Sequence, residues 1–103
     1  MKIVAVTACV VGMAHCKMAR KALKKEAKLR EIEFHCEAQT GEGIEHELDQ
    51  ADINAADLVI FAVDLAVRQK DRFKGKLIYE TSPSTVLKDT GKAFDEALKL
   101  LEK

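Results

Sequence analysis

Two stretches of the chain are almost continuously apolar and rich in β-branched residues. They cover residues 2–8 and 57–63. Runs of this kind are typical of strands that are buried on both faces of a parallel sheet. Residues 31–38 alternate polar and apolar side chains, which predicts an edge strand with one face in water. Residues 76–80 form a shorter apolar run and predict a last strand.

Helical patterns separate these strands. In residues 14–29 alanine, methionine and leucine recur every three or four positions while lysine and arginine fill the others, which predicts one long amphipathic helix. Residues 44–55 predict one or two short acidic helical turns. Ser82 followed by Pro83 is a typical helix start, with a capping side chain and a proline in the first turn. Gly91 interrupts the last apolar stripe, which predicts a short turn and then a terminal helix.

Strands and helices therefore alternate along the whole chain. This order predicts an α/β fold with a four-stranded parallel sheet, right-handed crossovers and helices on both faces, a Rossmann-like three-layer sandwich. If the alternating strand lies at an edge, the strand order is 2-1-3-4. Ligands of such sheets bind beyond the carboxyl ends of the strands, where the strand order reverses. Cys9, directly after the first strand, is expected at the mouth of that crevice.

Composition narrows the class of protein. A chain of 103 residues with 48% hydrophobic and 33% charged residues fits one globular domain, residues 1–103, without a disordered tail. No apolar run approaches the roughly 20 residues that a bilayer span needs, so we expect a cytoplasmic protein. Three cysteines without a C-x-x-C pair are expected to stay free thiols in a reducing compartment.

The charges balance in number but are segregated along the sequence. Residues 1–30 hold eight basic and one acidic residue, 31–67 hold ten acidic and no basic residues, and 68–103 hold nine basic and six acidic residues. This pattern fits either ordinary solvated faces or the steering of an acidic partner toward the basic first helix. Nucleic acid is not expected as a partner, because the net charge is zero and no aromatic residues lie among the basic ones.

The segment TACVVGMAHC, residues 7–16, carries the most informative chemistry. Cys9 follows a predicted strand and precedes a predicted helix, whose first N–H groups have no helical partner and attract anions. A thiol in such a place is expected to have a lowered pKa and to act as a nucleophile or in a phosphate site. A buried, inert cysteine is the competing interpretation. The spacing of Cys9, His15 and Cys16 does not fit a structural zinc site, so no metal and no cofactor are expected.

A cysteine followed by a short loop also occurs in the C-x5-R loop of cysteine-dependent phosphatases. Here the sixth residue after Cys9 is His15, and no arginine lies between Lys2 and Met18. A bidentate arginine stabilises the transition-state charge in that reaction. Its absence disfavours a phosphatase and favours a phosphocysteine that persists.

The same residues resemble a known family. The pattern KIVAVTAC..G.AH..MA...L at residues 2–23 resembles the phosphocysteine loop and first helix of the IIB component of the fructose-type phosphoenolpyruvate-dependent sugar phosphotransferase system (PTS), whose usual form is TACPTGIAHTYMAAEAL. The resemblance continues through IEHEL at 44–48, DINAADLVIFAVD at 52–64, RFKGKLIYE at 72–80 and the terminal helix. It therefore covers nearly the whole chain.

This resemblance implies a specific activity. Cys9 would accept a phosphoryl group from a phosphohistidine on the IIA component and pass it to a sugar held by the membrane-embedded IIC component. The protein would then be a protein-phosphocysteine sugar phosphotransferase, monomeric by itself, that reaches the inner face of the membrane through IIC. The backbone amides of one loop would cradle the phosphate, and its residues are Val10, Val11, Gly12, Met13, Ala14 and His15.

The loop departs from the usual family form at several positions. Val10 and Val11 replace a proline and a threonine, so the loop lacks a residue with fixed φ and a hydroxyl group. Cys16 and Lys17 replace a threonine and a tyrosine. The nucleophile and the backbone cradle stay intact, which favours a divergent, fructose-like member. The non-enzymatic alternative is a regulatory binding module that docks a IIA partner but transfers phosphate poorly.

Overall fold

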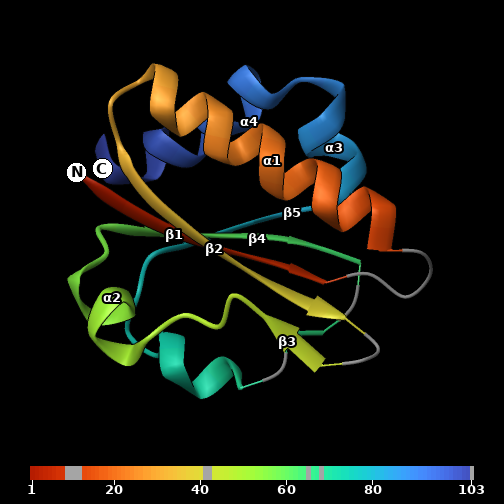
Figure 1. Ribbon diagram of the computed structural model, residues 1–103. Coiled ribbons are helices and arrows are strands. Elements are labelled where there is room, and N and C mark those ends of the chain that lie inside the picture. Colours follow the sequence, from red (N-terminus) through yellow and green to blue (C-terminus); the bar gives the residue numbers. More distant parts are fainter. Residues whose placement is uncertain (9–12, 41–42, 65, 68, 103) are drawn as a thin grey trace.

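The computed structural model describes residues 1–8, 13–40, 43–64, 66–67 and 69–102. They form one sheet between two layers of helices (Figure 1). The strands are β1 (Lys2–Ala8), β2 (Glu33–Thr40), β3 (Gly43–Glu45), β4 (Leu58–Val63) and β5 (Ile78–Thr81). The helices are α1 (Met13–Leu29), α2 (Gln50–Ala55), α3 (Pro83–Lys88) and α4 (Thr90–Lys99), with 3-10 helices η1 (Lys70–Phe73) and η2 (Leu100–Glu102).

The parallel part of the sheet has the order β2-β1-β4-β5, which confirms the predicted order 2-1-3-4. The predicted count of four strands is wrong, because β3 adds a short antiparallel strand outside β2. Ala38 pairs with Glu45, and Thr40 pairs with Gly43. Three residues are too few to show a strand periodicity, so the sequence pattern gave no sign of β3. The predicted edge strand β2 is therefore covered at its carboxyl end.

One face of the sheet is covered by α1, α3 and α4 (Figure 1). Alternate residues of β1 and β4 point to this face and meet small and apolar residues of the helices, so the layers approach closely. The buried cluster contains Ile3, Ala5, Leu58, Ile60 and Ala62 from β1 and β4, Cys36 from β2, and Ala19, Leu23, Ala27, Val86, Ala93, Phe94 and Ala97 from the helices. This is the larger of the two apolar cores.

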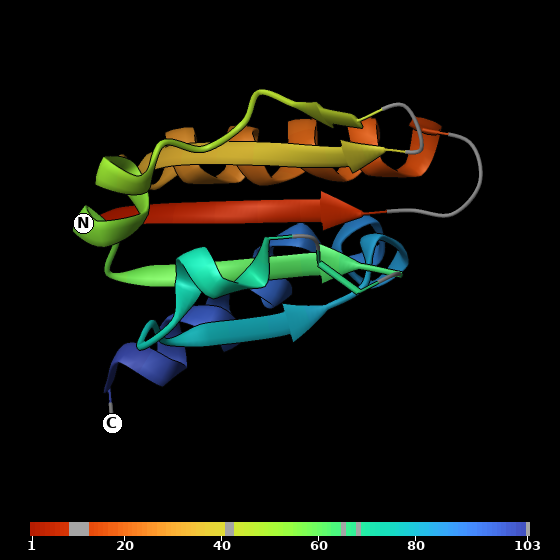
Figure 2. The same ribbon diagram turned by 90° about the horizontal axis from the view of Figure 1, so that it is seen from below.

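In the part of the chain that the structure describes, the helices on the opposite face are α2 and η1 (Figure 2). η1 lies over β4, and α2 lies near the amino ends of the strands. The apolar cluster of this face is smaller and is built on the other alternate residues of the strands. Phe61 of β4 and Phe73 of η1 stack edge to face, with centroids 5.2 Å apart. The remaining buried members are Val4, Val6, Leu48, Ile53, Ala56 and Val59. The prediction of helices on both faces is confirmed, with a thin layer here.

The prediction of a solvated face on the second strand is wrong at its carboxyl end. Glu33 and His35 are exposed as expected, but Glu37 is 0% exposed. Gln39, which follows the predicted strand, is 2% exposed. The segment that follows β3 lies against this end of β2, and η1 reaches the same place. These two polar side chains are thus buried by elements that are distant in sequence.

The start of α3 at Ser82 and Pro83 is confirmed, whereas the predicted interruption at Gly91 is wrong because α4 begins before that residue. Ser82 Oγ accepts a hydrogen bond from the Thr85 backbone N–H, at 3.2 Å, and caps α3. The helical stretch breaks at Asp89, two residues before Gly91, and the Asp89 carboxylate caps α4 by accepting from the N–H of Lys92. Within the ranges that the structure describes, no helix is long and apolar enough to cross a membrane.

Candidate functional site

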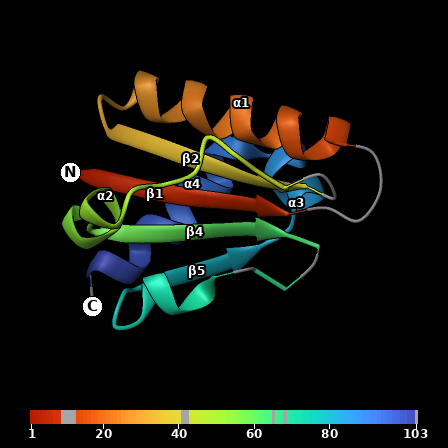
Figure 3. The same cartoon turned by 60° about the horizontal axis from the view of Figure 1, so that its bottom comes forward.

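The four parallel strands end at one edge of the sheet, and α1 begins at that same edge (Figure 3). β1 ends at Ala8 and α1 starts at Met13, so residues 9–12 join the two there. Ala8 pairs with Gln39 of β2 on one side and with Val63 of β4 on the other. This is the point where the strand order reverses, as the predicted strand order requires. Open α/β sheets bind ligands at such a point, and a site at this one stays a prediction.

The residues predicted to act at this edge differ in how far the structure describes them. Cys9, Val10, Val11 and Gly12 lie outside the described residues. Met13, Ala14 and His15 form the first turn of α1 in their backbone. The roles given to these seven residues stay predictions.

The start of α1 has the electrostatic properties of an anion site. Its first backbone N–H groups have no partner within the helix, and the helix dipole adds partial positive charge. The first turn contains no acidic residue that would neutralise this charge. A phosphoryl group or a thiolate placed at this end of the helix is therefore stabilised.

The exposed side of α1 is strongly basic. Lys17, Lys21 and Lys24 are exposed, and Met18 beside them is 54% exposed. Arg20 is half-buried, and its Nε donates to the backbone carbonyl of Cys36 at 3.4 Å. The predicted clustering of positive charge on this helix is confirmed, and the steering of an acidic partner stays a prediction.

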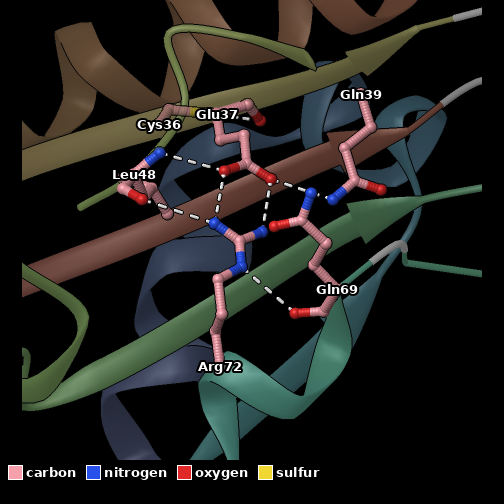
Figure 4. A network of polar contacts seen from close by, with 6 residues as sticks. All are labelled: Cys36, Glu37, Gln39, Leu48, Gln69 and Arg72. Carbon is pink, nitrogen blue, oxygen red and sulfur yellow. Dashed lines mark hydrogen bonds and ion pairs between the residues drawn. The ribbon is translucent and has the colours of Figure 1, made fainter. Parts of the chain in front are cut away.

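A buried polar network lies on the α2 side of the sheet, close to the same edge (Figure 4). Its centre is the carboxylate of Glu37. Arg72 of η1 donates to both carboxylate oxygens, from Nη1 and Nη2, each at 2.9 Å. The Leu48 N–H donates to Oε1 at 2.9 Å, and Gln39 Nε2 donates to Oε2 at 2.8 Å. The carboxylate thus receives four hydrogen bonds.

Arg72 is held along its whole side chain. Its Nε donates to the backbone carbonyl of Gln69 at 3.1 Å, and its Nη1 also donates to the carbonyl of Leu48 at 3.4 Å. The guanidinium carbon lies 5.1 Å from the centroid of Phe73. The network therefore joins β2, the segment after β3 and η1.

These contacts set the ionisation of the pair. Burial alone would raise the pKa of Glu37, but the hydrogen bonds from Arg72, Gln39 and Leu48 outweigh it and hold the pKa below its ordinary value. The hydrogen bond to Glu37 raises the pKa of Arg72. Both groups are charged at neutral pH, as a bidentate ion pair.

The sequence analysis did not select Glu37, Gln39 or Arg72. The first two occupy positions that alternate with apolar residues on a strand, which is the usual sign of a solvated face. Arg72 lies 35 positions from its partner. A buried carboxylate in a strand requires a cation, but nothing in the spacing of residues indicates which cation supplies it.

The hydroxyl of Thr7 is a second polar group near this edge. Thr7 is fully buried on β1, and its Oγ1 finds no hydrogen-bond partner in the part of the chain that the structure describes. Alternation along β1 places it on the α1 side, with Ile3 and Ala5. It is two residues before Cys9.

Cys36, His35 and His46 lie outside the group of residues predicted to act at this edge. Cys36 lies in the α1-side core, and burial raises the pKa of its thiol to about 12. His35 and His46 are exposed. No group of three or more histidine, cysteine or acidic side chains within the described ranges is arranged to hold a metal ion.

Comparison with known proteins identifies the family of this chain. The family model described as "PTS system, Lactose/Cellobiose specific IIB subunit" matches residues 4–96. The chain is 41% identical over 87 residues to the fructose-like EIIB component 2 of Escherichia coli K12, covering 84% of this chain and 82% of that protein. It is 43% identical over 98 residues to the fructose-specific EIIB'BC component of Rhodobacter capsulatus, but spans only 17% of that longer protein.

Solved structures agree with this assignment. A crystal structure of a predicted fructose-specific IIB from Escherichia coli has a TM-score of 0.93 at 30% identity, covering 99% of this chain and 90% of that one. A domain of the fructose-specific IIABC component of Borrelia burgdorferi has a TM-score of 0.89 at 39% identity, covering 95% and 93%. A lactose-specific IIB domain from Streptococcus pneumoniae, with a TM-score of 0.54 at 17% identity, shares the fold alone. The chain therefore belongs to the IIB components of the PTS, among those of fructose type.

Proposed function

We propose that this chain is the phosphoryl carrier of a fructose-like PTS. Cys9 accepts a phosphoryl group from a phosphohistidine of a IIA component and passes it to a sugar bound by a membrane IIC component. One observation carries the proposal: in a chain of this family, the segment that contains Cys9 joins the carboxyl end of the central strand β1 to the N-terminus of α1. Such a junction suits both a thiolate and a phosphate.

The transfer consists of two displacements at phosphorus. In the first, the thiolate of Cys9 forms an S–P bond while the N–P bond of the phosphohistidine breaks, and its electron pair stays on the imidazole nitrogen. In the second, a sugar hydroxyl oxygen forms an O–P bond as the S–P bond breaks. The electron pair of the S–P bond stays on sulfur and restores the thiolate, and the hydroxyl proton passes to solvent. No oxidant or reductant enters either step.

The phosphate is held chiefly by backbone N–H groups in this proposal. Those of residues 10–15 surround it, and the positive end of α1 stabilises its charge. The absence of a bidentate arginine in this segment fits a carrier, because a persistent phosphocysteine can wait for the next acceptor. The imidazole of His15 is a further hydrogen-bond donor to the phosphate.

The names of the relatives support the two partners. The Borrelia domain comes from a fructose-specific IIABC component, and the Rhodobacter relative is an EIIB'BC component. In those proteins the IIB part is joined to A or C parts. Here, a IIA component would donate the phosphoryl group and a IIC component would hold the sugar, so the chain would work in the cytoplasm at the inner face of the membrane.

The test is phosphoryl uptake from a phosphorylated IIA component of fructose type, followed by intact mass and by peptide mapping. We expect one phosphoryl group on Cys9. Cys9→Ser should abolish uptake, because a serine hydroxyl is almost wholly protonated at neutral pH and is a weak nucleophile in that form. The control Val11→Ala should take up phosphate at the wild-type rate, since its backbone N–H is unchanged.

Other outcomes would point elsewhere. Uptake by Cys9→Ser at the wild-type rate would place the chemistry at another residue. Release of inorganic phosphate without transfer to sugar would favour a phosphatase. Binding of IIA without phosphate uptake by the wild-type protein would favour a regulatory module.

A further inference from the structure

The Glu37–Arg72 ion pair lies beside the end of β1, and we propose that its two residues are positioning residues for phosphoryl acceptance. In this proposal, which rests on the proposed function, the pair fixes η1 and the residue before it, Gln69, at the edge of the sheet where Cys9 acts. Neither residue touches the phosphoryl group. They act by holding the segment after β4 in place.

The location of the network supports this role. Glu37 pairs with Val6, and Gln39 pairs with Ala8, so the network lies level with the last residues of β1. Arg72 extends from η1 past β4 and β1 to reach β2 (Figure 4). The side chain therefore links η1 to β2, the strand that pairs with β1.

The geometry of the pair is directional. Two parallel N–H donors on two carboxylate oxygens fix the distance and the orientation of the guanidinium relative to β2, which apolar contacts alone do not. A buried ion pair contributes little net stability compared with apolar residues of similar volume, because desolvation offsets the attraction. The positioning of η1 is therefore a better explanation for these two buried charges than a gain in stability.

The residue just before η1, Gln69, has an unfavourable backbone conformation that the ion pair helps to hold. Gln69 has a φ of 56°, in the left-handed region that is unfavourable for residues other than glycine. Its carbonyl accepts from Arg72 Nε at 3.1 Å. Arg72 thus bonds at one end to a strained residue of the segment after β4 and at the other end to a strand of the sheet.

The test separates position from stability with a charge-neutral double variant. In Glu37→Gln with Arg72→Met no charge is left unpaired, and the new amide oxygen still accepts from the Leu48 N–H. The bond from η1 to β2 is lost. The control Ile60→Val removes one buried methylene on the α1 side of the sheet. Phosphoryl uptake from phosphorylated fructose-type IIA is measured at several IIA concentrations, together with thermal unfolding and amide exchange of residues 69–73.

We expect the double variant to unfold within a few degrees of the wild type, to exchange the amides of residues 69–73 at least about 10-fold faster, and to lose about 10-fold in kcat/KM for uptake. Ile60→Val should keep the wild-type kcat/KM. Arg72→Lys keeps the charge but not the two-pronged contact, so it should fall between the two. Arg72→Lys also serves as the test variant if the double variant does not fold.

Two results would overturn the inference. The first is a folded double variant, or a folded Arg72→Lys, with wild-type kcat/KM. The second is a loss of uptake without faster exchange at residues 69–73. Failure of the proposed function looks different, because the wild-type protein and Ile60→Val would then also remain unphosphorylated, and the inference would fall with it.

Discussion

The two faces of the sheet are built by different physical means. On the α1 side, three helices cover the strands with an apolar cluster in which Phe94, Ile3 and Leu23 are fully buried. On the α2 side, one short helix and a 3-10 turn cover a smaller cluster, and a buried ion pair completes the layer. The first face follows directly from helical and strand periodicity. The second depends on residues that are distant in sequence.

This difference suggests that one face mainly stabilises the fold and that the other mainly positions segments at the carboxyl edge of the sheet. Apolar burial is roughly proportional to area and is not directional, so the α1 side should supply most of the free energy of folding. A bidentate pair is directional but offsets much of its own gain by desolvation. The α2 side should therefore matter more for where the segments at the carboxyl edge lie than for whether the chain folds.

The largest loss of stability is expected from Phe94→Ala on the α1 side. Phe94 is fully buried, and its ring lies 6.1 Å from that of Phe34. Truncation of a buried phenylalanine removes apolar burial and leaves a cavity, so the free energy of unfolding should fall by about 3–5 kcal/mol. Urea unfolding measures this change. If the free energy of unfolding falls by less than about 1 kcal/mol, this face is not the main source of stability.

The next largest effect is expected from Arg72→Met alone. It leaves the Glu37 carboxylate buried without its cation, which typically costs about 3 kcal/mol or more. Adding Glu37→Gln should recover most of that loss, because no charge is then left unpaired. The two urea unfolding curves give the comparison. If the double variant is no more stable than Arg72→Met, the pair itself stabilises the fold and the contrast between the faces is weaker than we infer.

The sequence predicted the α1 side well for a physical reason. Continuous apolar runs in β1 and β4 and the three-to-four periodicity of α1 are local patterns, and each is complete within one element. The order of the parallel strands followed from one further observation, that the strand at residues 31–38 looked less buried than the others. The carboxyl edge beside Cys9 was therefore predicted from sequence, while the role of Cys9 stays a prediction.

The α2 side could not be predicted in the same way. Glu37 looks solvated in the strand pattern, and Leu48 and Arg72 reach it from other elements. Gln39, just beyond the predicted strand, donates to the same carboxylate. β3 escaped notice because it is three residues long and pairs through the backbone. Both errors concern contacts between segments for which residue spacing carries no signal.

The pH dependence of the free energy of unfolding should distinguish the ion pair of the α2 side from the apolar α1 side. The pKa of Glu37 is lowered in the folded protein, so its contribution is present above the unfolded value of about 4.3 and is lost as the pH falls through the lower folded value. Between about pH 5 and pH 3, the free energy of unfolding of the wild type should therefore fall more steeply than that of the charge-neutral double variant. Urea unfolding at a series of pH values measures both slopes. Equal slopes would show that Glu37 does not contribute to this dependence.

The smallest effect is expected at Thr7, the polar exception on the α1 side. Thr7→Val keeps the branched shape that suits a strand and removes a buried hydroxyl that has no hydrogen-bond partner among the residues that the structure describes. The free energy of unfolding should therefore rise by up to about 1 kcal/mol, whereas Thr7→Ser, which keeps the hydroxyl and loses the methyl group, should lower it by about the same amount. Urea unfolding of both variants measures the sign. If Thr7→Val instead lowers the free energy of unfolding by more than about 1 kcal/mol, the hydroxyl forms a hydrogen bond with a part of the chain beyond β1. The apolar α1 side of β1 would then end at Ala5, and Thr7 would belong to the polar edge that Cys9 follows in sequence.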